Sequence, residues 1–414
     1  FIPIPGIDYN MVQDFMAKIS GTAMGRVLST ADLFTGGAMS HGSIFGLGIM
    51  PYISASIIFQ LLVAIVPSLS RIAHEGPTGR KRINQYTRLA TVGLCLVQGA
   101  MLCGGILAMG GHSGASFVSP NIASWQFYFF GVLALTAGTV FLMWLGEQID
   151  IFGIGNGTSL IIMAGILSRM PATAVNIIDG LAVANPGAGD IDLGKLALII
   201  AMFVGMTLAV VLITLGTRRV PVQQSKATRG RRVYGGQRQV LPLKVNQGGV
   251  IPIIFAQSIL MVVVQIAHYF GIEMYFRHTA FWYTFFYVVL IMFFCYFYAA
   301  VTFNPNEMAD NLKQSGMYIP GIRPGKRTAE YLERIMTRIA LAGSVFLSFI
   351  AITPDFVSQS LNVDYQISGM LGGTGLLIVV GVALDVVQRV ESYLLMKNYE
   401  GFGLAGGRIR GRRG

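Results

Sequence analysis

The stretch Gly48–Ala55, which reads GIMPYISA, lies inside one long apolar run, and Gly249–Ala256, which reads GVIPIIFA, lies inside another. Glycine, proline, isoleucine and alanine occupy matching positions in the two copies. Proline inside a membrane-spanning helix removes a backbone hydrogen bond, and this is tolerated only beside protein or a water-filled cavity. The echo therefore predicts two related halves, each with a broken helix beside a central pathway. Taken alone, four matching letters in two apolar segments are also compatible with chance.

The composition indicates a membrane environment. Hydrophobic residues make up 53% of the 414 residues, charged residues make up 12%, and the mean hydropathy is +0.62. A soluble domain carries about 25% charged residues. The apolar runs have the length of about 20 residues that a helix needs to cross a bilayer, and none alternates with the period of two that marks a barrel strand. The chain is therefore predicted to be an all-α polytopic membrane protein.

The apolar runs predict nine membrane spans. Their approximate bounds are Ser43–Leu69, Leu89–Met109, Phe127–Leu145, Thr158–Ile178, Leu193–Leu215, Gly248–Tyr269, Phe281–Phe303, Ile335–Phe356 and Gly369–Leu395. Lysine and arginine gather in four clusters, within residues 71–88, 218–244, 313–338 and 389–413. If nine helices alternate in direction, all four clusters lie on one side of the membrane. By the positive-inside rule, the basic loops and the C-terminus are predicted to be cytoplasmic.

The segment before the first span is short, mixed in polarity and rich in glycine. Residues 21–38 are too few to cross a bilayer, and they immediately precede the first echoed motif. They predict a re-entrant segment that enters a cavity from the outer side, with a surface loop as the alternative. The topology places Phe1 outside the cytoplasm, so we also expect a further segment upstream of it.

The enzyme signatures that the sequence offers are all incomplete. Gly187–Asp190 spells the glycine-aspartate motif of intramembrane aspartyl proteases but lacks a second intramembrane aspartate. His74 is followed by Glu-Gly-Pro, so no helix places a second zinc ligand one turn on. Gly321–Thr328 resembles a phosphate-binding loop but is one residue short, which favours a tight basic turn. We therefore predict a protein that is not an enzyme and has no cofactor, no metal and no ATP site.

A secondary transporter of a small solute is the alternative, because inverted repeats and broken helices suit it equally well. Coupling to ions usually requires ionisable groups near the middle of the membrane. The echoed motifs offer isoleucine, serine and glutamine instead, and the main exception is Asp385 toward the basic end of the last span. Aliphatic residues contributed by several helices at one depth form a constriction that resists wetting and blocks ions. This pattern favours a pore for something large and chemically varied.

Two basic loops carry more positive charge than orientation requires. The loop from Gly216 to Asn246 has eight positive residues and no acidic residue. The loop from Asn304 to Glu333 contains a Pro/Gly-rich turn that presents Arg323. These loops predict a docking surface for an acidic protein or for ribosomal RNA phosphates, with anionic phospholipid as the alternative partner.

Several long motifs, in order along essentially the whole chain, resemble the SecY family of bacterial protein-conducting channels. They are FIPIPGID (residues 1–8), TGGA (35–38), LGIMPYISASIIFQLL (47–62), FLMWLGEQI (141–149), GIGNG (153–157), GRRVYGGQ (230–237), LPLKVN (241–246), ADNLKQSG (309–316) and PGIRPG (320–325). The resemblance implies two pseudo-symmetric inverted halves of five helices around a central hourglass pore. It implies a channel that passes unfolded secretory polypeptides and releases transmembrane segments sideways into lipid.

The resemblance also implies how the chain is divided. Residues 1–180 would form an N-terminal half with a plug and the first gate helix, and residues 181–395 a C-terminal half with basic cytoplasmic loops at 216–247 and 304–334. Residues 396–414 would form a basic cytoplasmic tail. FIPIPGID follows the first transmembrane helix in family members, so this chain is expected to lack that helix and to have four spans in its first half.

Site residues are carried over by their place in the matching motifs. The pore ring would consist of Ile49, Ile53, Ile162, Ile254 and Ile378. The plug would span residues 26–38, with Arg26, Leu28, Leu33, Phe34, Gly36 and Gly37. The lateral gate would be lined by Ser54, Gln60, Gln257 and Ser258. Docking of the motor or the ribosome would use Arg231, Arg232 and Arg323.

Partners and location follow from the same resemblance. It implies the small membrane subunits SecE and SecG, the SecA motor ATPase, and the ribosome with its rRNA. Signal sequences and nascent polypeptides would be the cargo, and anionic phospholipids would contact the basic loops. The chain is expected in the bacterial plasma membrane as a multi-pass protein.

Overall fold

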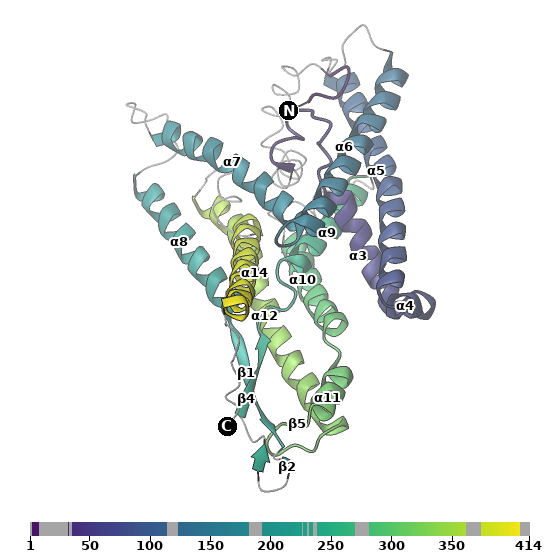
Figure 1. Ribbon diagram of the computed structural model, residues 1–414. Coiled ribbons are helices and arrows are strands. Elements are labelled where there is room, and N and C mark those ends of the chain that lie inside the picture. Colours follow the sequence, from purple (N-terminus) through teal and green to yellow (C-terminus); the bar gives the residue numbers. More distant parts are fainter. Residues whose placement is uncertain are drawn as a thin grey trace.

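The computed structural model describes residues 2–7, 32, 35–113, 123–181, 193–225, 227–229, 232–234, 238–269, 281–361 and 374–405. The helices are α3 (Met50–Ile65), α4 (Pro67–His74), α5 (Pro77–Ser113), α6 (Ser124–Phe152), α7 (Gly157–Leu181), α8 (Leu193–Leu215), α9 (Ile251–Tyr269), α10 (Phe281–Thr302), α11 (Pro305–Gln314), α12 (Lys326–Leu361) and α14 (Thr374–Ala405). The strands are β1 (Thr217–Gln224), β2 (Ala227–Arg229), β3 (Arg232–Tyr234), β4 (Arg238–Lys244) and β5 (Met317–Tyr318). The protein is mostly helical, as Figure 1 shows.

The membrane-spanning helices are fewer than the sequence predicts. Within the described part of the chain, six helices are long and apolar enough to cross a membrane, or seven if the bent pair α3 and α4 counts as one span. The pair bends by 105° beside Pro67. Of the remaining predicted spans, α9 contributes a shorter apolar stretch, Ile251–Leu260. The other, α14, carries Asp385, Arg389 and Glu391. A polytopic membrane protein is confirmed, whereas the count of nine spans is not.

The two echoed motifs begin helices instead of breaking them. Gly48 and Gly249 both have φ of +57°, and α3 and α9 each begin two residues later. A φ of this sign is one that glycine adopts without steric cost. Pro51 and Pro252 fall in the first helical turn, where the missing N–H would have had no intrahelical partner. The expected breaks inside the helices are therefore wrong, but the echo is a repeated helix start with the same backbone.

The helices form two groups that touch along two seams. In the first group, α3 packs on α5 and α6, α5 packs on α6, and α6 packs on α7. In the second, α9 packs on α10, α10 on α12, and α8 on both α12 and α14. The main contacts between the groups are α3 with α9 and α7 with α14 (Figure 1). A hydrophobic core runs through this meeting place and includes Ile57 of α3, Ile166 of α7, Phe255 of α9 and Leu377 of α14.

The basic loop after α8 folds as a β-hairpin, which corrects the expectation of an all-α chain. Strand β1 pairs with β4 in antiparallel register, from Thr217 opposite Lys244 to Gln223 opposite Arg238. Strand β5, from the second basic loop, pairs with the end of β1. Val220 and Val222 are buried and Pro221 between them is exposed, which is the period of two that a strand requires. The two predicted basic fingers are thus joined through one three-stranded sheet.

Candidate functional site

The five predicted ring isoleucines lie in one hydrophobic cluster, which contains residues from both groups of helices. Ile49 precedes α3 and Ile53 is in its first turn, while the other three come from α7, α9 and α14. Ile162 and Ile49 are 3% exposed, Ile254 is 7% exposed, Ile378 is 1% exposed, and Ile53 is partly buried against the same cluster. The structure therefore brings together four helices from both groups at this point. The cluster around these isoleucines also contains aromatic residues, among them Phe255, Tyr283 and Tyr287. The five isoleucine side chains themselves are aliphatic, so they can exclude water but offer no polar group to a solute.

Hydrogen bonds at the two helix starts place Ile53 and Ile254 in the same way. The amide of Ile53 donates to the carbonyl of Ile49 at 3.1 Å, and the amide of Ile254 donates to the carbonyl of Val250 at 3.3 Å. These are corresponding positions of the echoed motif. The repeated backbone therefore directs one isoleucine from each copy to the same cluster.

The predicted gate residues lie on two helices that contact each other, α3 and α9. Ser54 is half-buried and Gln60 is exposed on α3. On α9, Gln257 Nε2 donates to Thr374 Oγ1 of α14 at 3.4 Å, and Ser258 Oγ donates to the carbonyl of Ile254 at 2.8 Å. Gln257 and Ser258 are thus bonded within the second group of helices. Neither of these two hydrogen bonds crosses from α9 to α3.

Part of the predicted plug falls outside the described residues, namely Arg26, Leu28, Leu33 and Phe34. The described part packs closely on α7. Gly36 and Gly37 have φ of +65° and +89°. A Cβ built on Gly36 would lie 3.1 Å from the carbonyl oxygen of Gly165, and one built on Gly37 would lie 3.1 Å from Nε of Arg169. These glycines therefore allow both the turn and the close approach to the helix.

The pairing of Asp32, within the predicted plug, with Arg169 of α7 is a feature of the site that sequence reasoning missed. Arg169 Nη2 lies 2.8 Å from Asp32 Oδ2, and the two side chains are 19% and 4% exposed. Arg169 is the one charged residue within the predicted span Thr158–Ile178. An ionisable residue inside a span is costly and usually functional, so this position was a signal in the sequence. Its partner could not be identified without the fold, because the two residues are far apart in the chain.

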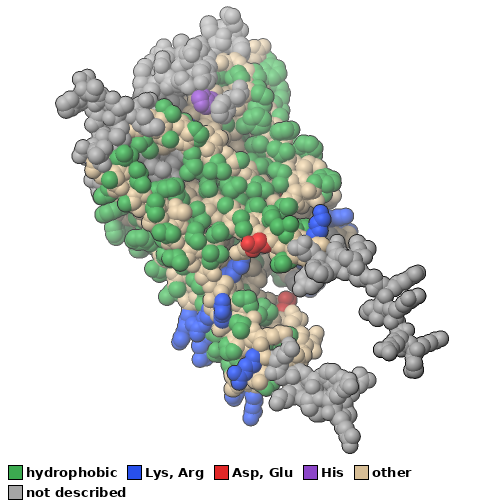
Figure 2. Space-filling view, turned by 60° about the vertical axis from the view of Figure 1, so that its left-hand side comes forward, with side chains coloured by type: hydrophobic (Ala, Val, Ile, Leu, Met, Phe, Trp, Pro, Cys, Tyr) green, Lys and Arg blue, Asp and Glu red, His purple; other side chains and the backbone are tan. Residues whose placement is uncertain are grey.

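The two basic loops form a single body with its own core, which we call the basic module. It comprises β1, β4, β5, α11 and residues 326–339 of α12. Val222 and Leu243 of the hairpin pack with Leu332 and Ile339 of α12. Lysine and arginine side chains gather at this end of the molecule, below the apolar surface, in Figure 2. The module therefore presents positive charge from both loops on one rigid support.

Of the three predicted docking arginines, the structure describes the side chain of Arg323 alone. Arg323 is exposed on a turn between Gly321 and Gly325, whose φ values are +86° and +101°. Thr328 Oγ1 donates to the carbonyl of Arg323 at 3.0 Å and ties the turn to the start of α12. Arg231 lies outside the described residues, and Arg232 is described only as backbone of β3. The turn that Pro320–Gly325 was expected to form is present.

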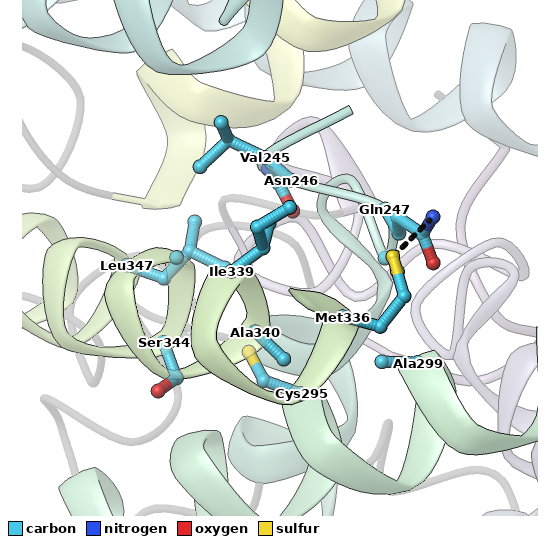
Figure 3. Close-up of a pocket in the computed structure, with 12 residues that line it drawn as sticks. Val245, Asn246, Gln247, Cys295, Ala299, Met336, Ile339, Ala340, Ser344 and Leu347 are labelled. Carbon is cyan, nitrogen blue, oxygen red and sulfur yellow. Dashed lines mark hydrogen bonds between the residues drawn. The ribbon is translucent and has the colours of Figure 1, made fainter. Parts of the chain in front are cut away.

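A small cavity marks the junction between the basic module and the helices (Figure 3). Its volume is about 20 Å³, roughly the space of one water molecule. Gln247 Nε2 donates to Sδ of Met336 at 3.6 Å, and within the described part of the chain Gln247 Oε1 has no hydrogen-bond partner. A Cβ built on Gly343 would lie 2.9 Å from the carbonyl oxygen of Val245, so α12 passes the end of the hairpin closely.

Comparison with known proteins decides the family. A family model described as SecY matches residues 43–387. The chain belongs to the SecY family. Protein translocase subunit SecY of Escherichia coli strain K12 is 43% identical over 410 residues, which cover 97% of this chain and 89% of that protein. Protein translocase subunit SecY of Thermus thermophilus is 42% identical over 424 residues, which cover 100% of this chain and 92% of that protein.

Solved structures show the same fold at lower identity. A structure described as that of a protein conducting channel is 18% identical, covers 99% of this chain and 97% of its own, and has a TM-score of 0.63. Sec61 in a canine ribosome-channel complex is 17% identical, with the same coverage and a TM-score of 0.58. The resemblance that the motifs indicated is confirmed. SecY relatives named as translocase subunits do not favour the alternative of a small-solute transporter.

Proposed function

We propose that this SecY-family chain conducts unfolded secretory polypeptides across a membrane and releases apolar segments sideways into lipid. One observation carries the proposal: five isoleucines from four helices and from both groups converge in a single apolar cluster. Because branched aliphatic side chains offer no hydrogen-bond partner, water and ions lose their solvation in passing them. An extended polypeptide is accommodated because aliphatic side chains shift between rotamers without losing specific bonds.

Sideways release would use the seam between α3 and α9. The two helices begin with the same backbone and contact each other, and their seam continues into the isoleucine cluster. Gln257 and Ser258 make their hydrogen bonds to Thr374 and Ile254, on the second group of helices. Separating α3 from α9 therefore costs mainly apolar contact, which an apolar segment of the cargo replaces.

Residues 26–38 would form a plug that covers the cluster when no cargo is present. Support comes from the close packing of Gly36 and Gly37 on α7, the helix that also carries Ile162. A solved SecY structure that is 19% identical to this chain, with a TM-score of 0.60, supports this proposal. Its description says that the plug domain of that SecY protein stabilises the closed state of the channel and maintains a membrane seal. Displacement of this segment by cargo would open the channel.

The basic module would be the docking surface on the cytoplasmic side of a bacterial plasma membrane. The sequence contains no complete ATP-binding motif, so the driving force would come from a bound partner, either the SecA motor or a translating ribosome. One of the similar structures is a ribosome-channel complex. Exposed arginine and lysine on a rigid support attract rRNA phosphates or an acidic protein surface. SecE and SecG would accompany the chain in the membrane, and anionic phospholipids would line the rim of the module.

Site-specific cross-linking of a stalled secretory polypeptide tests the proposed pathway. The native Cys95, Cys103 and Cys295 are first replaced by alanine, and single cysteines are then placed as Ile49→Cys and Ile254→Cys. We expect both cysteines to cross-link to a stalled polypeptide that carries a thiol-reactive probe. Ile58→Cys on α3 and Ile259→Cys on α9 are matched controls, because these residues are 45% and 38% exposed on the same helices. Equal cross-linking at all four positions would refute the pathway.

A further inference from the structure

An ion pair joins the plug segment to α7 at Arg169, the one charged residue of the predicted span Thr158–Ile178. Asp32 Oδ2 lies 2.8 Å from Arg169 Nη2. Arg169 Nη2 also donates to Ser40 Oγ at 3.3 Å. With 4% of the aspartate side chain and 19% of the arginine side chain exposed, the pair is largely removed from water. A charged pair in such surroundings is held strongly as long as both partners remain in place.

The two carboxylate oxygens of Asp32 have separate tasks. Oδ1 accepts hydrogen bonds from the backbone amides of Met39 at 3.1 Å and Ser40 at 3.0 Å, and from Thr35 Oγ1 at 3.3 Å. Oδ2 faces Arg169. Asp32 therefore closes the turn at residues 35–40 with one oxygen and attaches that turn to α7 with the other.

Glycine contacts bring the turn close enough for this pair to form. The backbone at Gly36 lies against Gly165, and Gly37 lies against the guanidinium of Arg169. Ile162 is on the same helix, seven residues before Arg169, which corresponds to about 10 Å along the axis. The attachment point and the isoleucine cluster are thus two turns apart on one rigid element.

We propose that the Asp32–Arg169 ion pair holds the plug segment on α7 and sets how readily the closed channel opens. The inference rests on the proposed function, because it assigns a task within the plug and the seal described above. Any event that moves the turn away from α7 must separate the two charges. The pair therefore raises the free energy of opening and makes opening depend on the energy that bound cargo supplies. Asp32 and Arg169 are positioning residues, since they act through the plug.

The proposal is tested with variants that remove the ion pair with Arg169 but keep the hydrogen bonds by which Asp32 closes the turn. Asp32→Asn keeps an oxygen for the amides of Met39 and Ser40 but removes the charge that faces Arg169. Arg169→Met keeps an apolar side chain of similar length without charge, and Arg169→Lys keeps the charge. The full chain, purified with its partner subunits, is inserted into planar lipid bilayers, and ionic conductance is recorded in the absence of cargo. Translocation of a secretory precursor is measured in vesicles, with an intact signal sequence and with one weakened by a charge in its apolar core.

If the ion pair holds the plug, the variants should differ in resting conductance and in translocation of the weakened precursor in a specific pattern. Asp32→Asn and Arg169→Met are each expected to raise the resting conductance by about tenfold or more, because each leaves the closed state without the pair. Both are expected to pass the weakened precursor better than the wild type does. Arg169→Lys is expected to stay near the wild type. The double variant Asp32→Asn/Arg169→Met is expected to leak less than Asp32→Asn alone, because no unpaired charge remains buried.

Other outcomes overturn the inference in distinct ways. Wild-type conductance in both single variants would show that the pair does not hold the plug. Additive increases in the double variant would assign the effects to separate structural damage. The control is Glu147→Gln, which breaks the pair between Arg88 and Glu147 on α5 and α6, 2.6 Å apart and partly exposed. An equal increase in that control would also overturn the inference. If the wild-type complex translocates no precursor, the proposed function fails instead, whatever the conductances are.

Discussion

Single glycines fix the two helix starts that bring the isoleucines together. Gly48 and Gly249 have the same φ of +57°, but their surroundings differ. A Cβ at Gly48 would lie 2.8 Å from Cγ2 of Thr35, in the plug segment, whereas a Cβ at Gly249 would meet nothing within 4 Å. The same substitution at the two positions therefore separates backbone strain from steric conflict with the plug.

The comparison of Gly48→Ala with Gly249→Ala is a prediction at this scale. Gly249→Ala is expected to lower the free energy of unfolding by about 1–2 kcal/mol, because a left-handed residue with a Cβ is strained. Gly48→Ala should lower the free energy of unfolding by about 1 kcal/mol more than Gly249→Ala does, because its new methyl group also overpacks against Thr35. Thermal unfolding in detergent measures both. Adding Thr35→Ser, which removes Cγ2 and keeps the hydroxyl, should bring Gly48→Ala back to the level of Gly249→Ala. No effect of Thr35→Ser would contradict the steric explanation.

At the scale of elements, the basic module depends on a core that is separate from the central isoleucine cluster, although α12 contributes residues to both. Leu332 is fully buried among Val220, Val222 and Leu243 of the hairpin and Ile335 of α12. The hairpin carries many like charges, which repel one another and oppose its folding. The buried aliphatic residues provide the stabilisation that keeps these charges in a fixed arrangement.

Leu332→Ala is accordingly expected to loosen the hairpin. Truncation of a fully buried leucine costs about 2–5 kcal/mol, and the loss should be concentrated in the module. Amide hydrogen exchange is expected to become faster in Thr217–Gln224 and to stay unchanged in α5 and α6, which lie outside this core. Arg334→Ala, a change at an exposed position on the same helix, serves as the control. Uniform acceleration throughout the chain would show that the module has no separate core.

Some elements of this fold can be predicted from the sequence and others cannot, for physical reasons. Membrane-spanning helices and basic loops follow from composition, since hydropathy and charge act locally. The strands are hard to predict because the many charged residues of 217–244 are also typical of a loop, and only Val220 and Val222, which flank the exposed Pro221, show the period of two. The sequence does not distinguish a helix start from a helix break at Gly48 and Gly249, because proline in an apolar run is compatible with either until the backbone is known. The pairing of Asp32 with Arg169 is tertiary and has no local signature beyond a lone charge in a span.

At the scale of the whole molecule, the isoleucine cluster and the basic module are separate, but two helices reach both of them. These helices are α12 and α14. Leu347 and Ile350 of α12 belong to the central cluster, while Ile335 and Ile339 belong to the module. Lys244 Nζ on β4 also donates to Gln388 Oε1 on α14, at 3.4 Å. The helices α12 and α14 thus connect the basic module physically to the isoleucine cluster.

Charge reversal tests whether the module docks a partner or only orients the chain. Arg323→Glu is expected to reduce translocation of a secretory precursor by about tenfold or more, because it sets a like charge against an acidic partner surface. Resting conductance and membrane insertion should not change. Arg71→Glu, at an exposed position on α4, alters the net charge by the same amount away from the module. Equal losses in both variants would assign the effect to lipid electrostatics, and wild-type translocation by Arg323→Glu would exclude a docking role.

The paired helix starts have an electrical consequence for the closed state. Ile49 caps α3 without any side-chain hydrogen bond, and Val250 and Ile251 at the start of α9 pack on the same cluster. Amides of a first helical turn have no acceptor within their own helix and carry partial positive charge, about half an elementary charge per helix. Two such ends beside the proposed constriction would give it a positive potential. If the proposed channel leaks at rest, this potential would admit anions more readily than protons or sodium, so a transmembrane proton gradient would be spared.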